Sequence, residues 1–400
     1  MKPKVVIIGH GYLSRLSLVR SVAELGCEIT VVVMTAPFST SNPPKKPIDC
    51  YSKYVDKVLY CARKDRESLI ALLLKDCNDP NQKVVLIPDG DDVVATIDNH
   101  KEILAPHFLF PHIEKEPSSV VYWMEKTNQK QMAQEVGLHV AEGRVIEISD
   151  GHYHIPSEIK YPCYSKPLAT MTGGKGGMRR CDNEGDLESA LQFIIENRNK
   201  SEKVLVEDYK EIETEFALLG FSNGREVVIP GILEFLAVSK FNKGIALQGK
   251  VETVTGFEDI VEKFKQLILK IGFVGVFDID FYKSGGLYYF CELNLRYGGS
   301  GYAITKMGVN LPAMMVRFFY GESIDGMQTS VTGNATYINE RMCMDDLEGG
   351  YITYKEYRRY KRTADIRFVP DAYDPAPEKA YRREYRERVI VNWVKSFLRK

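Results

Sequence analysis

Apolar residues in the first part of the chain occur in short unbroken runs separated by longer amphipathic stretches. Residues 4–8, 28–34 and 84–87 are such runs, and residues 12–25 have helical periodicity. Unbroken apolar runs that alternate with helices indicate a parallel sheet covered on both faces. Residues 1–113 are therefore predicted to form a Rossmann-like domain.

From about residue 118 the pattern changes to helices mixed with alternating strands. Helical periodicity predicts helices over residues 120–137, 184–197 and 257–271. Strict alternation between turn residues predicts antiparallel hairpins over residues 213–235 and 275–297. This half of the chain is predicted to be a mixed α/β structure and not a continuation of the first sheet.

The composition is that of an ordinary globular protein. The chain has 400 residues, of which 44% are hydrophobic and 27% charged, with a formal net charge of −1. This length predicts two or three domains, and the balanced charge gives no indication of nucleic-acid binding. No apolar run has membrane-spanning length, and the eight cysteines show no metal-like spacing. A cytoplasmic protein with reduced thiols is expected.

The sequence GHG at residues 9–11 resembles the start of a dinucleotide-binding fingerprint. That fingerprint requires glycine at position 14, where this chain has Ser14, and an acidic residue after the second strand, where it has Met34 and Thr35. Because both confirming features are absent, binding of NAD is not expected. The glycines are predicted to shape a turn, which could face a substrate.

Residues 290–302 carry polar side chains where a buried strand should be apolar. Glu292, Asn294 and Arg296 occupy alternate positions, and Leu293 and Leu295 lie between them. Side chains in a strand alternate between faces, so the three polar groups share one face. Burying them is costly unless a charged partner meets them, which indicates a ligand.

Two further acids lie on the preceding strand of the same hairpin. If residues 284–286 form a three-residue turn, Asp278 and Asp280 share a face with Glu292 and Asn294. Carboxylate and amide oxygens on one face suit Mg²⁺, which phosphates and water then complete. The alternative is that the acids simply face solvent; the opposite face already supplies the core.

A glycine-rich segment over residues 172–177 follows a predicted strand that ends at Lys166 and Pro167. It does not match the Walker A pattern. A hairpin tip is one interpretation, and a mobile lid over polyphosphate beside a fixed cation is the other. Lys126 is a second candidate cation, although a lone helical lysine is often just solvated.

Further acidic residues follow along the chain. Glu207, Asp208 and Tyr209 end an apolar strand, and Glu215 lies in the next strand. These residues could be exposed on the surface, or they could contact the adenine and ribose of a nucleotide.

In this order, the lysines, the glycine-rich loop, the acids and the polar hairpin resemble the ATP-grasp superfamily over roughly residues 84–325. The hairpin is the most specific part and is similar to the metal-binding hairpin of biotin carboxylase and carbamoyl phosphate synthetase. The resemblance implies an α/β fold in which a Rossmann-like pre-ATP-grasp domain precedes a two-lobed ATP-grasp fold with an α+β lid. The implied units are 1–113, the N-terminal lobe 114–208, the C-terminal lobe 209–326 and an extension 327–400.

The resemblance also implies roles for individual residues. Two Mg²⁺ (or Mn²⁺) ions would be held by Asp280, Glu292 and Asn294, with Asp278 left open. ATP would be bound by Lys126, Lys166, Gly173, Gly174, Lys175, Gly176, Glu207, Asp208, Tyr209 and Glu215. In this set the two lysines Lys126 and Lys166 would contact phosphates, Glu207 and the backbone of Asp208 and Tyr209 would hold adenine, and Glu215 would contact the ribose. Glu213 competes with Glu215, because the spacing before this position is uncertain by one or two residues. The implied catalytic residues are Arg296 and Lys166.

The implied activity is a carboxylate–amine ligase that activates a small-molecule carboxylate as an acyl phosphate and joins it to an amine. The run over residues 296–322 is similar to D-aspartate ligases, which places the substrate at Arg296, Gly298, Gly299 and Ser300. The alternatives are a non-catalytic ATP-binding regulatory or scaffold protein and a subunit similar to carboxylases or carbamoyl phosphate synthetase.

The C-terminal segment carries little chemistry. Residues 379–400 predict a basic amphipathic helix. Packing on its own domain or on a partner in a homodimer is the favoured role, and binding to an acidic surface is the alternative.

Overall fold

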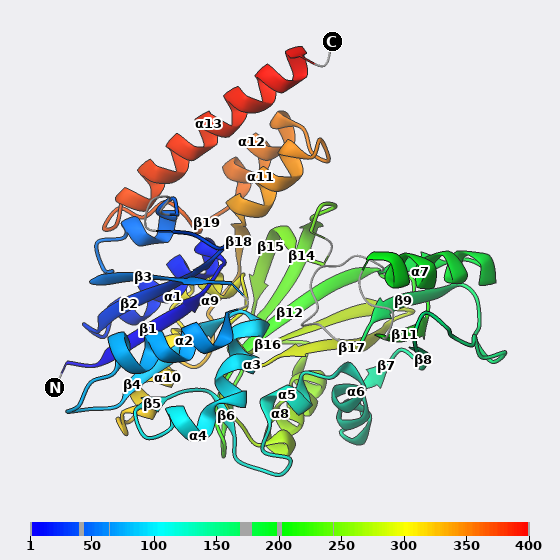
Figure 1. The fold of residues 1–400 in the computed structure, drawn as a ribbon, viewed down its shortest axis with the longest axis horizontal. Helices are drawn as coiled ribbons and strands as arrows, with labels where there is room; N and C mark the ends of the chain where they lie inside the picture. The colour runs from blue at the N-terminus through cyan, green and yellow to red at the C-terminus, as the bar shows by residue number, and fades with distance from the viewer. Residues whose placement is uncertain are drawn as a thin grey trace.

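The structure is a computed structural model. It describes residues 2–39, 44–63, 65–168, 178–197, 202–242 and 244–398, with side chains to residue 388. In these ranges the strands form three sheets, and the sheets and helices build a body from which the C-terminal helix projects (Figure 1).

The N-terminal domain is built on a five-stranded parallel sheet with the order β3-β2-β1-β4-β5. Its strands are β1 (Lys4–Gly9), β2 (Glu28–Thr35), β3 (Lys57–Ala62), β4 (Val84–Asp89) and β5 (Phe108–Leu109). Its helices are α1 (Tyr12–Ala23), α2 (Arg66–Leu72), α3 (Asp91–Asn99) and α4 (Lys101–Leu104), with short turns at Ile48–Tyr51 and Leu73–Cys77. The Rossmann-like prediction is confirmed. The sequence pattern missed β3, a half-exposed strand, and β5, which has two residues.

The small lobe is an antiparallel four-stranded sheet covered by one helix. Its order is β10-β9-β11-β8, and the helix packs on an apolar core around Leu191 and Val204. The elements are β8 (Gly143–Ile148), β9 (Cys163–Pro167), β10 (Arg179–Cys181), α7 (Glu184–Asn197) and β11 (Glu202–Asp208). The predicted lid glycines, with Lys175, lie outside the described residues.

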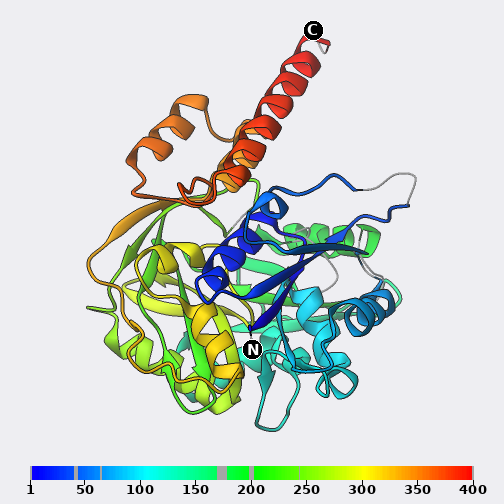
Figure 2. The same cartoon turned by 90° about the vertical axis from the view of Figure 1, so that its left-hand side faces the viewer.

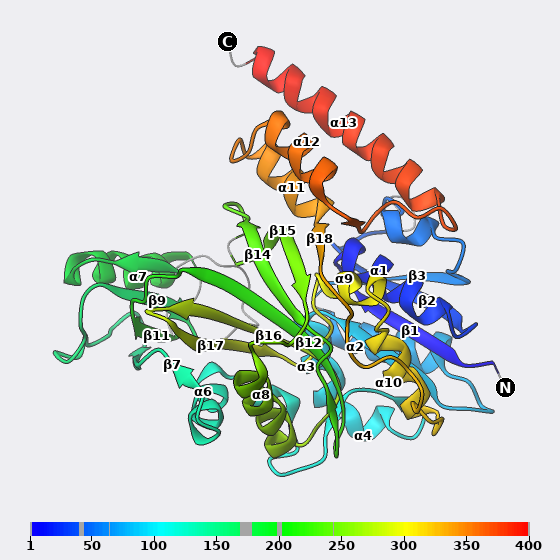
Figure 3. The same cartoon turned by 180° about the vertical axis from the view of Figure 1, so that it is seen from behind.

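The third sheet has ten strands and forms the centre of the molecule (Figure 3). Its strands are β6 (His112–Ile113), β7 (His139–Val140), β12 (Thr214–Asn223), β13 (Val227–Val228), β14 (Ile232–Val238), β15 (Ala246–Glu252), β16 (Phe273–Ser284), β17 (Leu287–Asn294), β18 (Ala335–Ile338) and β19 (Ile366–Arg367). Both predicted hairpin regions are confirmed. One face packs on α8 (Glu258–Ile271), whose amphipathic pattern the sequence showed, and the other packs on α9 (Gly301–Lys306) and α10 (Leu311–Phe319).

The central hairpin β16–β17 differs from its prediction at the turn. Ser284 pairs with Leu287, so the turn has two residues, both glycines with positive φ, and not three. A two-residue turn alone would place Asp280 opposite Cys291 and put Glu292 on the core face. A bulge at Cys291 shifts the register, so Asp280 pairs with Glu292. The predicted shared face is therefore confirmed, for a different reason.

The predicted single helix over residues 120–137 is divided in two. α5 (Val120–Trp123) and α6 (Lys126–Glu135) are separated by Glu125, whose backbone is extended. α6 ends before Gly137, which has a left-handed conformation, as its position in the sequence indicated. The break makes Lys126 the first residue of a new helix.

The C-terminal segment joins the body at several places. β18 pairs with β15 in the central sheet, and α11 (Glu340–Glu348), α12 (Tyr354–Thr363) and α13 (Ala376–Leu398) follow. The buried side chain of Arg20 on α1 forms an ion pair with Asp374 at 3.0 Å. α13 begins against α11 and α12 through Tyr381 and Tyr385 and then extends away (Figure 2). Within the described residues, no helix has both the length and the apolar character needed to cross a bilayer.

Candidate active site

A cavity of about 1220 Å³ lies where the N-terminal domain, the central sheet and the C-terminal segment meet. Its lining includes Asp280, Glu292, Asn294 and Arg296 from the central hairpin, which together we call the hairpin wall. Strand ends of the N-terminal domain form the opposite side, and α11 contributes Arg341. The polar hairpin therefore faces an open space and not a packed core.

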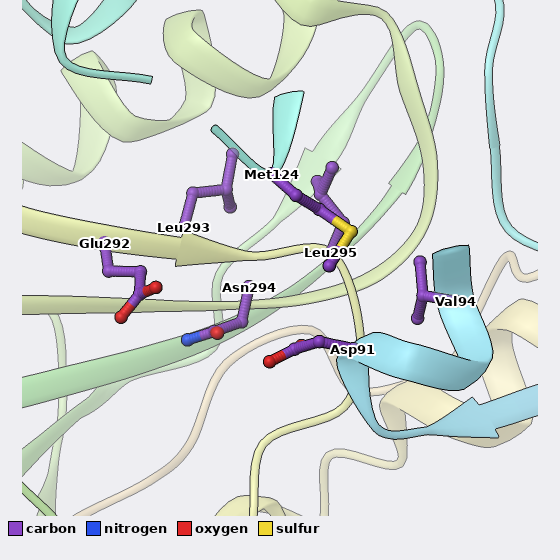
Figure 4. A pocket seen from close by; sticks show the side chains of 7 residues that line it. All are labelled: Asp91, Val94, Met124, Glu292, Leu293, Asn294 and Leu295. Atoms are coloured by element: carbon purple, nitrogen blue, oxygen red, sulfur yellow. The ribbon is translucent and has the colours of Figure 1, made fainter. Parts of the chain in front are cut away.

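The two faces of the hairpin differ as predicted. Leu293 and Leu295 are buried in the core with Ile279, whereas Glu292 and Asn294 project from the other side of the strand (Figure 4). This arrangement follows from strand alternation together with the bulge at Cys291.

Carboxylates crowd the polar face. Asn294 donates from Nδ2 to Asp280 Oδ2 at 3.4 Å. Asp278 is buried beneath them, and burial, with the charges of Glu292 and Asp91, raises its pKa to about 7 although Arg296 opposes the shift. A Cβ atom on Gly298 would lie 2.5 Å from the Asp278 carboxylate, so this glycine lets the backbone approach the acid.

Arg296 is held between the hairpin and the N-terminal domain. Its Nε lies 2.7 Å from Asp91 Oδ1, and its Nη2 donates to Asn294 Oδ1 at 3.3 Å. Burial alone would disfavour the charge, but Asp91 and Asp278 raise the pKa of Arg296 above its ordinary value. The guanidinium therefore stays charged and is held in place beside the acidic side chains of the hairpin.

One face of α6 supplies the groups that align the hairpin. Lys126 contacts Glu292 in an ion pair. Gln129 accepts from the Leu293 amide at 2.9 Å and donates to the Leu293 carbonyl at 2.7 Å, which locks the helix to β17. Lys130 completes the i, i+3, i+4 face and donates to the Ala141 carbonyl at 3.0 Å.

Glu207 joins two of the cations. Its two carboxylate oxygens contact Lys130 and Lys166 in ion pairs, and all three side chains are buried. Burial and the positive charges of neighbouring lysines lower the pKa of both Lys130 and Lys166, and Cys291 opposes both shifts. Glu207 is therefore the common partner of two lysines, and the adenine contact expected of it from the sequence stays a prediction.

The other nucleotide residues that we predicted lie on neighbouring elements. The amides of Asp208 and Tyr209 donate to the carbonyls of Glu142 and Pro162, so contacts of these two residues to adenine would come from other atoms. Glu215 lies on β12 opposite Tyr282, beside the polar end of β16. Its competitor Glu213 instead accepts from the Gly286 amide at 3.2 Å, at the hairpin turn.

Several residues at this site were not predicted from the sequence, among them Asp91, Lys130 and Cys291. The i+4 spacing from Lys126 could have indicated Lys130. Asp91 is the first residue of α3 and pairs with Arg296 across 205 positions, so no local pattern could have shown this contact. The place of Cys291 at this site could not be predicted without knowing that β17 has a bulge there. Of the predicted substrate residues, Gly299 and Ser300 line the cavity with Arg296.

The donor set fits a hard cation. Across the described ranges, no group of three or more His, Cys, Asp or Glu side chains is arranged to hold a metal ion. The predicted set is instead two carboxylates and one amide oxygen, from the two strands of the hairpin, on one face and open to the cavity. Oxygen donors of this number suit Mg²⁺ that keeps water or phosphate ligands.

The comparison with known families decides the family of this chain. A family model described as the carbamoyl-phosphate synthase L chain, ATP binding domain, matches residues 125–326, just over half of the 400 residues. The chain belongs to this family. It is thus an ATP-grasp protein of the ATP-dependent ligase type, and the resemblance seen in the sequence is confirmed.

Individual relatives are distant. The carbamoyl phosphate synthase large chain of Agathobacter rectalis is 26% identical over 263 residues, which cover 63% of this chain and 24% of that protein. The chain therefore spans about a quarter of the length of that curated relative.

Solved structures show the same fold. N5-carboxyaminoimidazole synthetase from Staphylococcus aureus matches with a TM-score of 0.62 and 18% identity, covering 89% of this chain and 87% of that one. L-amino acid ligase from Bacillus licheniformis matches with a TM-score of 0.59 and 16% identity, covering 84% and 79%. At this identity the likeness concerns the fold alone.

Proposed function

We propose that this ATP-grasp protein is a carboxylate–amine ligase. It transfers the γ-phosphoryl group of ATP to a carboxylate, most simply that of an amino acid, and an amine then displaces phosphate from the acyl phosphate. ADP and phosphate are released. An L-amino acid ligase among the structures of the same fold supports this choice of chemistry.

The observation that carries the proposal is the position of Arg296. This fixed guanidinium lies beside Asn294 and opens onto the cavity, where it would meet the phosphoryl group in transit. Phosphoryl transfer needs positioning and charge neutralisation more than a protein nucleophile. A protein that only binds nucleotide has no need of the arginine in this place.

The other predicted residues would bind the phosphates and the metal ion. Lys126 and Lys166 would hold phosphate oxygens, and Asp280, Glu292 and Asn294 would hold Mg²⁺. When bound, this ion neutralises phosphate charge and polarises the transferring group. The Glu292 carboxylate is paired with Lys126 in this structure. It would have to leave Lys126 to bind the metal ion. The position of Glu215 beside the polar strands supports it over Glu213 as the ribose contact.

The test is a screen for Mg²⁺-dependent release of ADP over a panel of amino acids and other small carboxylates, with hydroxylamine present to trap an acyl phosphate as a hydroxamate. We expect ADP release and hydroxamate formation with at least one carboxylate. ADP release without hydroxamate, or no ADP release with any carboxylate, would contradict the proposal and favour a non-catalytic nucleotide-binding role.

A further inference from the structure

The side of the cavity that faces the hairpin wall comes from the N-terminal domain. His10 follows β1, Arg63 follows β3, and Asp92 lies in the first turn of α3 after β4. The carboxyl ends of parallel strands meet at one edge of a sheet, where α/β proteins bind ligands. All three side chains line the cavity, and we call them the N-terminal wall.

Two glycines bring His10 to this position. Cβ atoms on Gly9 and Gly11 would lie 2.4 Å from the Asp89 carbonyl oxygen and 3.3 Å from the Asp89 carboxylate. The turn therefore lies directly against the end of β4, and a side chain at position 9 would collide with the backbone of that strand. The GHG sequence thus allows this close approach to β4.

The groups of the N-terminal wall face each other without closing into a tight network. Arg63 Nη2 lies 3.5 Å from His10 Nε2, Arg63 Nε lies 3.8 Å from Asp92 Oδ2, and His10 Nδ1 lies 3.9 Å from Asp92 Oδ1. The Arg63 side chain is 51% exposed. A guanidinium with such long contacts can turn to bind a carboxylate or phosphate through two hydrogen bonds.

The N-terminal wall is joined to the site of phosphoryl transfer. Asp91 pairs with Arg296, and the next residue, Asp92, faces His10. Burial and the charges of Arg63, Arg15 and Arg296 lower the pKa of His10, while Asp92 opposes this shift. This shift favours the uncharged imidazole, which can accept a proton.

We propose that the N-terminal wall binds the amine substrate of the ligase, that this amine carries an anionic group held by Arg63, and that His10 removes its proton. The inference rests on the proposed function and names the class of its second substrate: an amine that is also an acid, such as an amino acid.

The step balances as follows. The amine nitrogen forms a bond to the acyl carbon, the bond from that carbon to the phosphate oxygen breaks, and phosphate leaves with the electron pair. The proton lost by the nitrogen goes to His10 Nε2, which becomes free when Arg63 turns to the anionic group. Asp92, facing Nδ1, stabilises the imidazolium that forms.

The experiment compares wild type, His10→Gln, Arg63→Met and the exposed control His152→Gln in two assays. One assay measures hydroxamate formation with hydroxylamine, which is uncharged at neutral pH and needs no base. The other measures amide formation with the twenty amino acids as amines and with the carboxamide of each. We expect His10→Gln to lose about 100-fold or more in amide formation, the usual range for a proton acceptor, with hydroxamate formation within about threefold of wild type.

Arg63→Met should raise KM for the amino acid at least about tenfold, since a bidentate anion contact is lost, and leave KM for its carboxamide unchanged. The inference is overturned if His10→Gln lowers both assays equally or neither, or if wild type prefers the carboxamides. Hydroxamate formation also reports folding of each variant. If the wild type itself makes no hydroxamate, the proposed ligase function is wrong. This result differs from the results that overturn only the roles of His10 and Arg63.

Discussion

The hairpin wall and the N-terminal wall both present charged groups to one cavity, but they hold them differently. In the hairpin wall, Glu292 contacts Lys126 and Arg296 lies 2.7 Å from Asp91, so these two charges have close partners. In the N-terminal wall, the contacts of Arg63 lie at 3.5 and 3.8 Å. Closely paired charges are fixed before the ligand arrives, as transfer of a phosphoryl group requires. Loosely paired charges can rearrange around a substrate.

The largest effect is expected when the fixed guanidinium of the hairpin wall is removed. Arg296→Ala should lower kcat by roughly 100- to 1000-fold, on the order of 3 kcal/mol for one preorganised contact to developing charge. Binding of ATP, measured by calorimetry, should remain close to wild type. The exposed Arg225→Ala is the matched control. Normal turnover in Arg296→Ala would remove this residue from the reaction.

The second largest effect is expected when a carboxylate that would bind Mg²⁺ is replaced by an amide. Asp280→Asn and Glu292→Gln should each lower activity at limiting Mg²⁺ by roughly 100-fold, since a direct ligand matters at least as much as the outer partners of metal sites. A titration with Mg²⁺ measures this, and the exposed Glu226→Gln is the control. Unchanged Mg²⁺ dependence in both variants would place the ion elsewhere.

A smaller effect is expected at the link between the two walls. Asp91→Asn keeps an oxygen acceptor for Arg296 but removes the charge, so kcat should fall about tenfold, equivalent to about 1.4 kcal/mol for one charge-assisted contact. KM for ATP should stay the same, and the exposed Asp76→Asn serves as the control. A rise in KM for ATP with constant kcat would show that Asp91 acts on the nucleotide instead.

The smallest effect is on stability at the base of the N-terminal wall. Burial raises the pKa of Asp89 to about 7, although Arg15 and Arg296 oppose the shift and Asp49 adds to it. From about pH 4 to 7 the unfolded chain has lost this proton while the folded chain keeps it, so the stability of wild type falls as pH rises through this window.

Asp89→Asn removes this dependence. The variant should therefore gain on the order of 1 kcal/mol or more relative to wild type between pH 4.5 and pH 8, measured by urea unfolding. Asp259→Asn, at an exposed helix end, should show no such trend. A constant difference between Asp89→Asn and wild type over this range would mean that Asp89 is ionised in the fold.

Much of the fold could be predicted because its signals are local. The apolar runs of β1, β2 and β4 and the amphipathic α8 follow directly from periodicity. The missed elements lacked such signals: β5 has two residues, and the break between α5 and α6 occurs without glycine or proline.

In the candidate site, too, local patterns predicted some features and missed others. Alternation in β17 put Glu292 and Asn294 on one face, yet the turn length was wrong and the bulge at Cys291 restored the register. The partners of these residues were beyond local reasoning. Lys126 lies 166 positions from Glu292, and Asp91 lies 205 positions from Arg296.

The sequence by itself determined the layers of the fold, the family and the polar hairpin, because strand alternation, helical periodicity and turn glycines act over a few residues. Only the tertiary structure decided that Glu207 joins two lysines and that His10, Arg63 and Asp92 line one cavity with Arg296. The ends of separate strands meet in space only after the sheets have packed, and charges acquire partners at that stage.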